Sequence, residues 1–144
     1  MLIRRNFLNV AVAAIALPAI SRICNAQTSQ GGPQLTLLLR ADLERQGQTV
    51  QETVVNLLEM APGISAPWHM HPGAQEIIFL LDGNLVVETE GNGSKEVAVG
   101  EVALISAETP HLVRNDTQTW ARALVTHSRA DKEKPFLVVL KRPA

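Results

Sequence analysis

Short apolar segments separated by turn signals run through most of this chain. Glycine-containing turns are indicated at 61–63, 82–83 and 91–93, and similar signals recur about every 8–12 residues. Between the turns, the side chains either alternate between apolar and polar, as in 50–60, or form a short apolar run. Turns this closely spaced leave no room for long helices. The pattern therefore predicts an all-β sandwich or barrel.

About nine short strands are expected, with one helical turn at 41–47. The strands are predicted at 34–40, 50–60, 76–81, 85–90, 95–99, 102–105, 111–115, 121–127 and 136–140. The segment 76–81 is almost continuously apolar, which is typical of a strand covered on both faces. Hydrophobic residues make up 46% of the chain but aromatic residues only 3%. Aliphatic side chains must therefore fill the barrel.

The first 26 residues have the features of an export signal, so they are left out of the predicted fold. Arg4 and Arg5 precede an apolar run at 10–20, which is too short to span a bilayer comfortably. Small residues ending at Ala26 suit cleavage after that position. The paired arginines favour a twin-arginine signal over an ordinary secretory signal. We expect an exported protein, located in the periplasm or another extracytoplasmic compartment.

Cleavage after residue 26 would change the chemistry of the remaining chain. It would remove the only cysteine, Cys24, and three arginines, which leaves 10 basic and 14 acidic residues and a formal net charge of −4. The mature chain would have no disulfide, no thiolate ligand and no membrane anchor. No basic patch suggests nucleic-acid binding. A polar linker at 27–33 then leads into a single domain at 34–144.

Three of the four histidines form one spaced pattern with a glutamate. His69 and His71 are two residues apart, which places both imidazoles on one face of a strand. Glu76 follows after a Pro-Gly turn, and His111 comes from a distant segment. Three imidazoles and one carboxylate suit a divalent metal such as Fe, Mn, Ni, Cu or Zn and leave positions open on an octahedral ion. The remaining histidine, His127, is expected to be a hydrogen-bonded core residue.

The spacing around these residues resembles the cupin superfamily. The first motif of the family matches 63–83, where Gly63, His69, His71, Glu76 and Gly83 occupy its positions. The second motif matches 100–115, where Gly100, His111 and Asn115 occupy its positions. The 16 residues between the motifs are close to the shortest stretch typical of small bacterial cupins. With the flanking strand patterns, the resemblance covers 34–140 and implies a single double-stranded β-helix, or jelly-roll, barrel of the cupin type-2 kind.

The resemblance also implies a set of metal ligands. They are His69, His71, Glu76 and His111. Gln75 is the alternative to Glu76, because the fourth ligand falls at its position in family members whose spacer is one residue shorter. Gln75 and Glu76 point to opposite faces of a strand, so only one can reach the metal. The anionic Glu76 is favoured. Ser106 and Glu108 stand where the family usually has Pro and Gly, in the turn before His111.

The resemblance implies an enzyme that acts on a small organic molecule, with oxygenase, isomerase, decarboxylase and lyase chemistries in the family. The retained ligand set favours a metalloenzyme, such as a metal-dependent dioxygenase. The alternative is a non-catalytic envelope protein that binds a small molecule or a metal, because a fold does not specify a function. Export of a folded protein would let Mn²⁺ or Fe²⁺ bind before Cu²⁺ or Zn²⁺ compete, so Mn or Fe is favoured over Ni, Cu or Zn. The apolar strands permit a homodimer.

Overall fold

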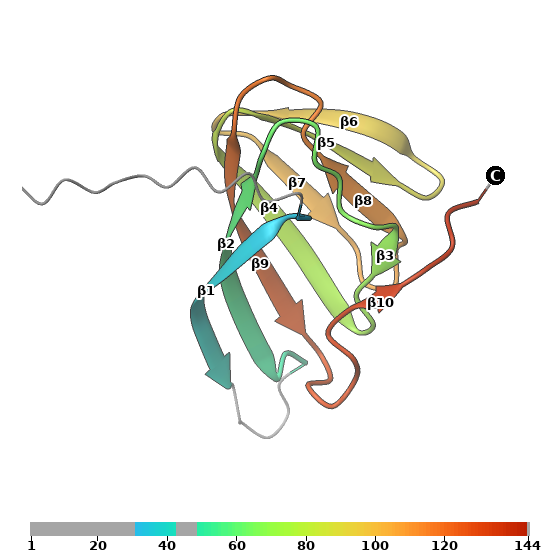
Figure 1. Cartoon of the computed structure of the whole chain (residues 1–144). Helices are drawn as coiled ribbons and strands as arrows, with labels where there is room; N and C mark the ends of the chain where they lie inside the picture. Colours follow the sequence, from blue (N-terminus) through green and yellow to red (C-terminus); the bar gives the residue numbers. More distant parts are fainter. Residues whose placement is uncertain (1–30, 43–48, 144) are drawn as a thin grey trace, which may run out of the picture.

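The computed structural model describes residues 31–42 and 49–143. Ten strands, and no helix, occur in these two ranges (Figure 1). The strands are β1 (Gln34–Asp42), β2 (Glu52–Met60), β3 (His69–Met70), β4 (Ala74–Asp82), β5 (Asn84–Thr89), β6 (Gly93–Ala98), β7 (Val102–Ile105), β8 (His111–Arg114), β9 (Ala121–Arg129) and β10 (Val138–Val139). The predicted strands are present with small shifts of their ends, and β3 is an addition.

Two of the sequence predictions concern residues at the edge of the described ranges. The expected helical turn at 41–47 is wrong at its start, because β1 extends through Asp42. Residues 43–47 lie outside the described residues, as does the predicted export signal at 1–26. In the described part of the chain, no helix has the length and hydrophobicity that crossing a membrane requires.

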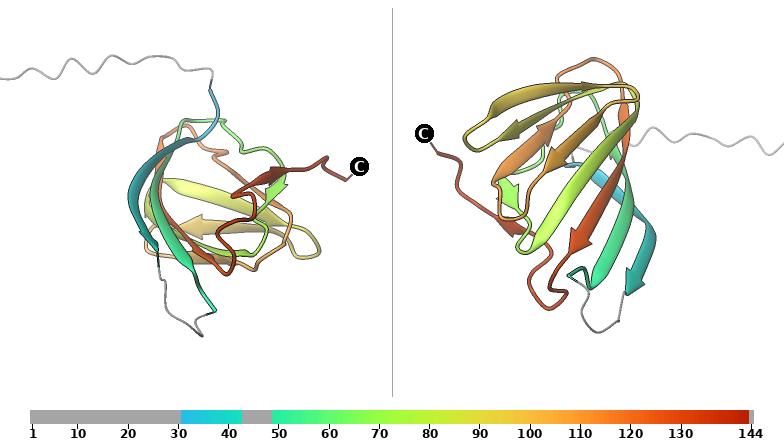
Figure 2. Two further views of the ribbon diagram at one scale, coloured as in Figure 1. Left: turned by 90° about the horizontal axis from the view of Figure 1, so that it is seen from below. Right: turned by 180° about the vertical axis from the view of Figure 1, so that it is seen from behind.

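The strands form two antiparallel five-stranded sheets that face each other (Figures 1 and 2). One sheet has the order β1-β2-β9-β4-β7, and the other has the order β10-β3-β8-β5-β6. Strands that are distant in sequence are neighbours in both sheets: β4 pairs with β9, and β3 pairs with β8. From β2 onward, the chain passes back and forth between the two sheets. This is the double-stranded β-helix, or jelly-roll, arrangement. The predicted all-β fold class is therefore confirmed.

The core lies between the two sheets and is aliphatic. Buried and half-buried residues alternate along all of β2, as the sequence pattern predicted. Its inward residues Leu58 and Met60 join a hydrophobic cluster that includes Ile78 and Leu80 from β4 and Leu85 from β5. The cluster contains only aliphatic side chains and one methionine. The small aromatic content is therefore compatible with a continuous core.

The apolar run in β4 is covered on one face only. Its residues alternate between buried and exposed, and Ile77, Phe79 and Leu81 are 37–38% exposed on the outer face of the sheet. The expectation of a strand covered on both faces is therefore wrong within the described chain. The physical reason is that this fold has only two layers, so each sheet has one inner and one outer face. A short apolar run does not by itself reveal what covers the outer face.

Gly83 forms the turn between β4 and β5 and allows close approach to another segment. Its φ is +79°, and a Cβ built there would lie 2.5 Å from the carbonyl oxygen of Trp120. We expect Gly83→Ala to lower the free energy of unfolding by about 2 kcal/mol or more, measured by urea denaturation. Gly91→Ala is the control, because Gly91 has a similar φ of +80° with no atom within 4 Å of its Cβ position. Its expected loss is about 1 kcal/mol. Equal losses in the two variants would contradict a role for the Trp120 contact.

Candidate metal centre

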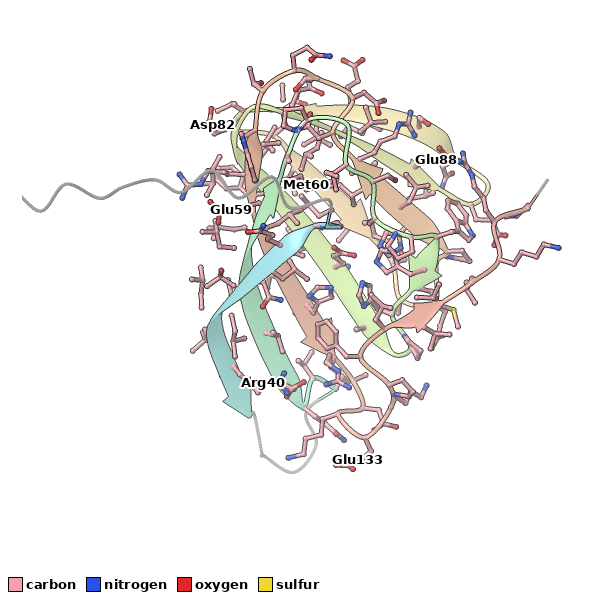
Figure 3. All side chains as sticks on the ribbon, in the orientation of Figure 1. Arg40, Glu59, Met60, Asp82, Glu88 and Glu133 are labelled. Atoms are coloured by element: carbon pink, nitrogen blue, oxygen red, sulfur yellow. The ribbon has the colours of Figure 1, made fainter. Side chains whose placement is uncertain are left out.

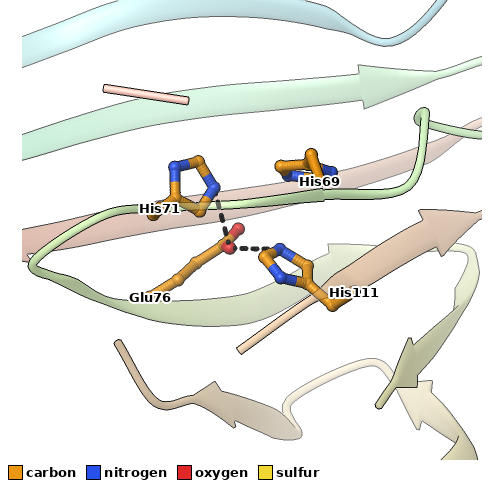
Figure 4. Close-up of side chains that lie close together, drawn as sticks. All are labelled: His69, His71, Glu76 and His111. Carbon is orange, nitrogen blue, oxygen red and sulfur yellow. Dashed lines mark ion pairs between the residues drawn. The ribbon is translucent and has the colours of Figure 1, made fainter. Parts of the chain in front are cut away.

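Four buried side chains meet in the interior of the barrel (Figure 4). They are His69, His71, Glu76 and His111, and their potential ligand atoms all lie within 4.8 Å of one another. Glu76 Oε2 is 2.9 Å from His111 Nε2 and 3.3 Å from His71 Nε2. We call these four residues the His/Glu cluster. The structure thus brings together all four residues that the sequence pattern singled out.

Strand pairing explains how two motifs so far apart in sequence meet. His69 in β3 lies directly opposite His111, the first residue of β8. Glu76 occupies an inward position of β4, where the buried and exposed side chains alternate. His71 follows the two-residue strand β3 and is therefore not itself in a strand, although its ring still reaches the cluster.

The turn before His111 differs from the usual family sequence and still forms. Glu108 adopts a φ of +62°, which glycine accepts more readily than a residue with a side chain. Its Oε1 accepts a hydrogen bond of 2.8 Å from the backbone N–H of Gly73. Gly73 belongs to the turn after His71, so this bond links the turns that carry two residues of the cluster. The glutamate gives a contact that a glycine at 108 would lack.

Backbone carbonyls determine which ring nitrogen of each cluster histidine carries its proton. Nδ1 of His69 donates to the Pro67 oxygen at 2.8 Å, and Nδ1 of His111 donates to the Thr109 oxygen at 2.9 Å. Nδ1 of His71 donates to the carbonyl oxygen of Phe136 at 2.6 Å. Since a carbonyl only accepts, each Nδ1 must bear the hydrogen, and each neutral ring keeps on Nε2 the lone pair that can bind a metal.

His71 alone in the cluster takes its backbone partner from a distant segment. Phe136 lies 65 residues later, in the stretch between β9 and β10. Arg129 holds this stretch, because its Nη1 pairs with the buried carboxylate of Glu52 and its Nη2 donates to two backbone oxygens within 132–134. The orientation of one proposed ligand therefore depends on the C-terminal part of the chain.

Burial and mutual proximity shift the pKa values of three side chains in the cluster. Burial raises the pKa of Glu76, but the adjacent imidazoles of His111 and His71 outweigh burial and hold that pKa well below its usual range. Burial lowers the pKa of His111, and the Glu76 carboxylate outweighs this and raises it above the ordinary value. Burial dominates at His69 and lowers its pKa to about 4. Without a metal, the cluster therefore holds an anionic Glu76 beside a readily protonated His111 and a neutral His69.

Two buried atoms of the cluster lack hydrogen bonds, and this supports a metal site. Glu76 Oε2 and His111 Nε2 are 2.9 Å apart, and Glu76 Oε2 is also 3.3 Å from His71 Nε2, yet neither Glu76 Oε2 nor His111 Nε2 makes a hydrogen bond. Buried polar atoms are rarely left unsatisfied. Two ligands that bind one ion at about 2.1 Å and at right angles lie about 3 Å apart, close to the observed separations. One oxygen and three nitrogen donors suit a divalent transition metal.

Gln75 lies outside the cluster. It is exposed on the outer face of β4, whereas the adjacent Glu76 is buried. We expect Glu76→Ala to weaken metal affinity by more than about 100-fold, because it removes the anionic donor rather than a group that orients a donor. Gln75→Ala should change affinity by less than about threefold. Calorimetric titration with Mn²⁺ and metal content after dialysis would measure both. The opposite ranking would mean that position 75 supplies the ligand.

His127 lies against the cluster, which sequence reasoning did not foresee. It is buried, as predicted, and it stands opposite Glu76 in the pairing of β4 with β9. Its Nε2 is 3.3 Å from His71 Nε2 and 3.8 Å from Glu76 Oε1, and its Nδ1 has no hydrogen-bond partner. Burial lowers the pKa of His127 to about 4, so the ring is neutral near pH 7. Strand alternation marks His127 as inward-facing, but only the register of β9 against β4 places it here.

A cavity of about 250 Å³ adjoins the cluster. Residues of both sheets and of the 136–137 segment line it. Figure 3 draws the side chains of the described residues, and the lining residue Met60 is labelled there. The lining residues are Pro33, Leu35, Leu58, Met60, Ala66, Pro67, His69, His71, Glu76, Val113, Val125, His127, Phe136 and Leu137. Apart from three histidines and Glu76, these described lining residues are apolar. The volume is below the range of about 300–1,000 Å³ that is usual for drug-sized ligands.

Comparisons with known proteins agree with this geometry. A stretch of 77 residues is 34% identical to Germin-like protein 1 of Brassica napus, and the alignment covers 51% of this chain but only 37% of that protein. The fold is similar to a double-stranded β-helix protein from Klebsiella pneumoniae subsp. pneumoniae MGH 78578, with a TM-score of 0.62, 15% identity and coverage of 79% and 89% of the two chains. It is also similar to a recombinant oxalate oxidase in complex with glycolate, with a TM-score of 0.61 and 26% identity, covering 78% of this chain and 57% of that one.

The family evidence coincides with the cluster. The Cupin domain family matches residues 56–127, which is half of the chain and includes all four cluster residues. Because the family's sequence pattern, the jelly-roll fold and the His/Glu cluster coincide in one segment, this chain belongs to the cupin family.

Proposed function

We propose that this protein is an exported, metal-dependent cupin enzyme that acts on a small organic molecule. The observation that carries the proposal is the convergence of three imidazole Nε2 atoms and Glu76 Oε2 beside a cavity. A divalent transition metal held by these atoms would supply Lewis acidity toward substrate oxygen atoms, and redox chemistry if it is iron, manganese or copper. The similarity to an oxalate oxidase supports an oxidative reaction.

The chain's own residues have distinct roles in this proposal. The His/Glu cluster would hold the ion, and the backbone oxygens at 67, 109 and 136 would keep its imidazoles oriented. Apolar wall residues such as Met60 and Phe136 would exclude water and position the body of the substrate. His127 offers a neutral ring beside the cluster and could hydrogen-bond to the substrate's polar end.

We propose Mn²⁺ or Fe²⁺ as the resident metal, with Ni²⁺, Cu²⁺ or Zn²⁺ as alternatives. Affinity at nitrogen and oxygen sites rises from Mn²⁺ toward Cu²⁺, so a protein that folds outside the cytoplasm would fill with the stronger competitors. Twin-arginine export carries folded proteins and so would preserve a metal loaded beforehand. Metal analysis of protein purified from its native cell envelope tests this idea. Zinc or copper alone in that preparation would contradict it.

Metal content, oxygen uptake and product formation, measured together, test the proposed function. The substrates should include phenolic, enol and β-dicarbonyl compounds and oxalate. We expect turnover of at least one compound, dependent on metal, lost in Glu76→Ala and kept in Gln75→Ala. Binding of these compounds to the metal-loaded protein without any conversion would instead support the non-catalytic binding protein.

A further inference from the structure

The cavity beside the His/Glu cluster combines apolar walls with one polar region. Side chains such as Leu58, Met60, Val125 and Phe136 form the walls. The polar lining groups belong to the cluster itself or to His127, whose Nε2 lies 3.3 Å from His71. A ligand in this cavity therefore meets hydrogen-bonding groups near the cluster and hydrocarbon elsewhere. This favours a molecule with a short polar end and an apolar body.

Among the described residues that line the cavity, there is no lysine or arginine. Arg129 is not one of the lining residues, and its guanidinium lies 5.3 Å from the centre of the Phe136 ring. Its Nη1 is engaged by Glu52, and its Nη2 donates to backbone oxygens of the 132–134 stretch. The lining residues within 31–42 and 49–143 therefore offer no cation to pair with a second negative charge on a ligand. Burying an unpaired charge against hydrocarbon is unfavourable.

We infer that the cavity selects a small, mainly apolar molecule whose polar end presents two oxygen atoms with at most one negative charge, as a β-diketone or its enolate does. The inference rests on the proposed function, because the metal would receive the polar end. Three neutral imidazoles and one carboxylate leave a divalent ion with one unbalanced positive charge. A monoanionic end balances that charge, whereas a dicarboxylate or a phosphate ester brings an excess negative charge among apolar side chains.

Pentane-2,4-dione and malonate form a matched pair of probes for this selectivity. Both place two oxygen donors on a three-carbon unit, but two methyl groups of the diketone are replaced by charged carboxylate oxygens in malonate. The protein is first loaded with Mn²⁺, and its metal stoichiometry is measured before and after titration. We expect calorimetry to show a Kd for malonate at least about tenfold weaker than that for the diketone. Equal or tighter binding of malonate would overturn the inference.

Leu137 offers a way to separate the cavity's contribution from the intrinsic chelating strength of the probes. It lines the cavity and is 40% exposed, so Leu137→Arg should fold and place a cation at the rim. We expect this variant to reduce the preference for the diketone by about tenfold or more through tighter malonate binding. Val139→Arg is the control, because Val139 is 61% exposed in the neighbouring β10 and does not line the cavity. Its preference should match that of the unmodified protein.

The outcomes distinguish this inference from the proposed function. A protein that takes up no stoichiometric metal would contradict the proposed function and the inference together. A metal-loaded protein that prefers malonate, or whose preference is unchanged by Leu137→Arg, would overturn the inference and leave the proposed metal centre intact. A diketone preference that falls in Leu137→Arg and persists in Val139→Arg would support the inference.

Discussion

Replacing His71 with alanine is expected to abolish metal binding while the barrel remains folded. His71 supplies one of four converging donor atoms, and the hydrogen bond from its Nδ1 to the carbonyl of Phe136 holds its ring in place. Loss of a residue that only orients a ligand lowers metal affinity by about 10–100-fold, and loss of the ligand itself should exceed that range. Metal content after dialysis, calorimetric titration with Mn²⁺ and far-ultraviolet circular dichroism would measure binding and folding.

The fourth histidine provides the matched control for this experiment. His127 is as buried as His71 and adjoins the same cavity, but it is not one of the four convergent residues. Because His71 Nδ1 bears the hydrogen, His127 Nε2 must be the donor in the 3.3 Å contact with His71 Nε2. A metal and His127 would therefore compete for the same lone pair, so His127→Ala should retain its metal. Stoichiometric metal in His71→Ala, or equal loss in both variants, would contradict the ligand assignment.

The stability that a bound metal adds is expected to disappear in acid. A protonated imidazole cannot bind a metal, so protons and metal compete for the cluster. The pKa of His111 is raised above its ordinary value, so competition begins there as the pH falls. The pKa of His69 is about 4, so protonation of this ring follows at lower pH. Since metal stabilises the folded state by RT ln(1 + L/Kd), where L is the free metal concentration, the difference in Tm between holo and apo protein should shrink between about pH 7 and 4.

The metal-free protein has its own pH dependence, which the comparison must subtract. The pKa values of His69 and His127 are about 4 in the folded state, below the value of 6.5 expected on unfolding. The unfolded chain therefore binds more protons between about pH 6.5 and 4, and the apo protein loses stability as the pH falls through this window. His111 opposes this trend, because its raised pKa adds stability below 6.5 that is lost as the pH rises through the folded pKa.

Melting curves of both forms between pH 7.5 and about 4, with metal in known excess, would measure these effects. The holo protein should melt at the higher temperature near neutral pH, and the two curves should coincide at the acidic end. A difference that stays constant down to about pH 4 would contradict histidine ligation, because imidazoles that bind protons competitively cannot hold the metal equally well at both ends.

The strand pattern and the residues of the cluster could be predicted from the sequence because they depend on local spacing. Alternation along 50–60 determines which side chains of β2 face inward, since successive residues of a strand point to opposite faces. The same rule separates Glu76 from Gln75, and the structure places them on opposite faces of β4. The short spacing of His69 and His71 brings both rings to one place, even though the strand ends at Met70.

Contacts between segments that are far apart in the sequence could not be predicted from it and depend on the tertiary structure. The position of His127 beside Glu76 depends on the register of β9 against β4, and the Phe136 carbonyl reaches His71 because the C-terminal segment returns to the cluster. The exposed outer face of β4 depends on how many layers the fold has. A strand's sequence specifies which face each side chain occupies, but the partner strand and its register arise from packing the whole chain. The sequence by itself therefore determined the residues of the cluster, while the folded barrel determined the cavity and the neighbours that surround it.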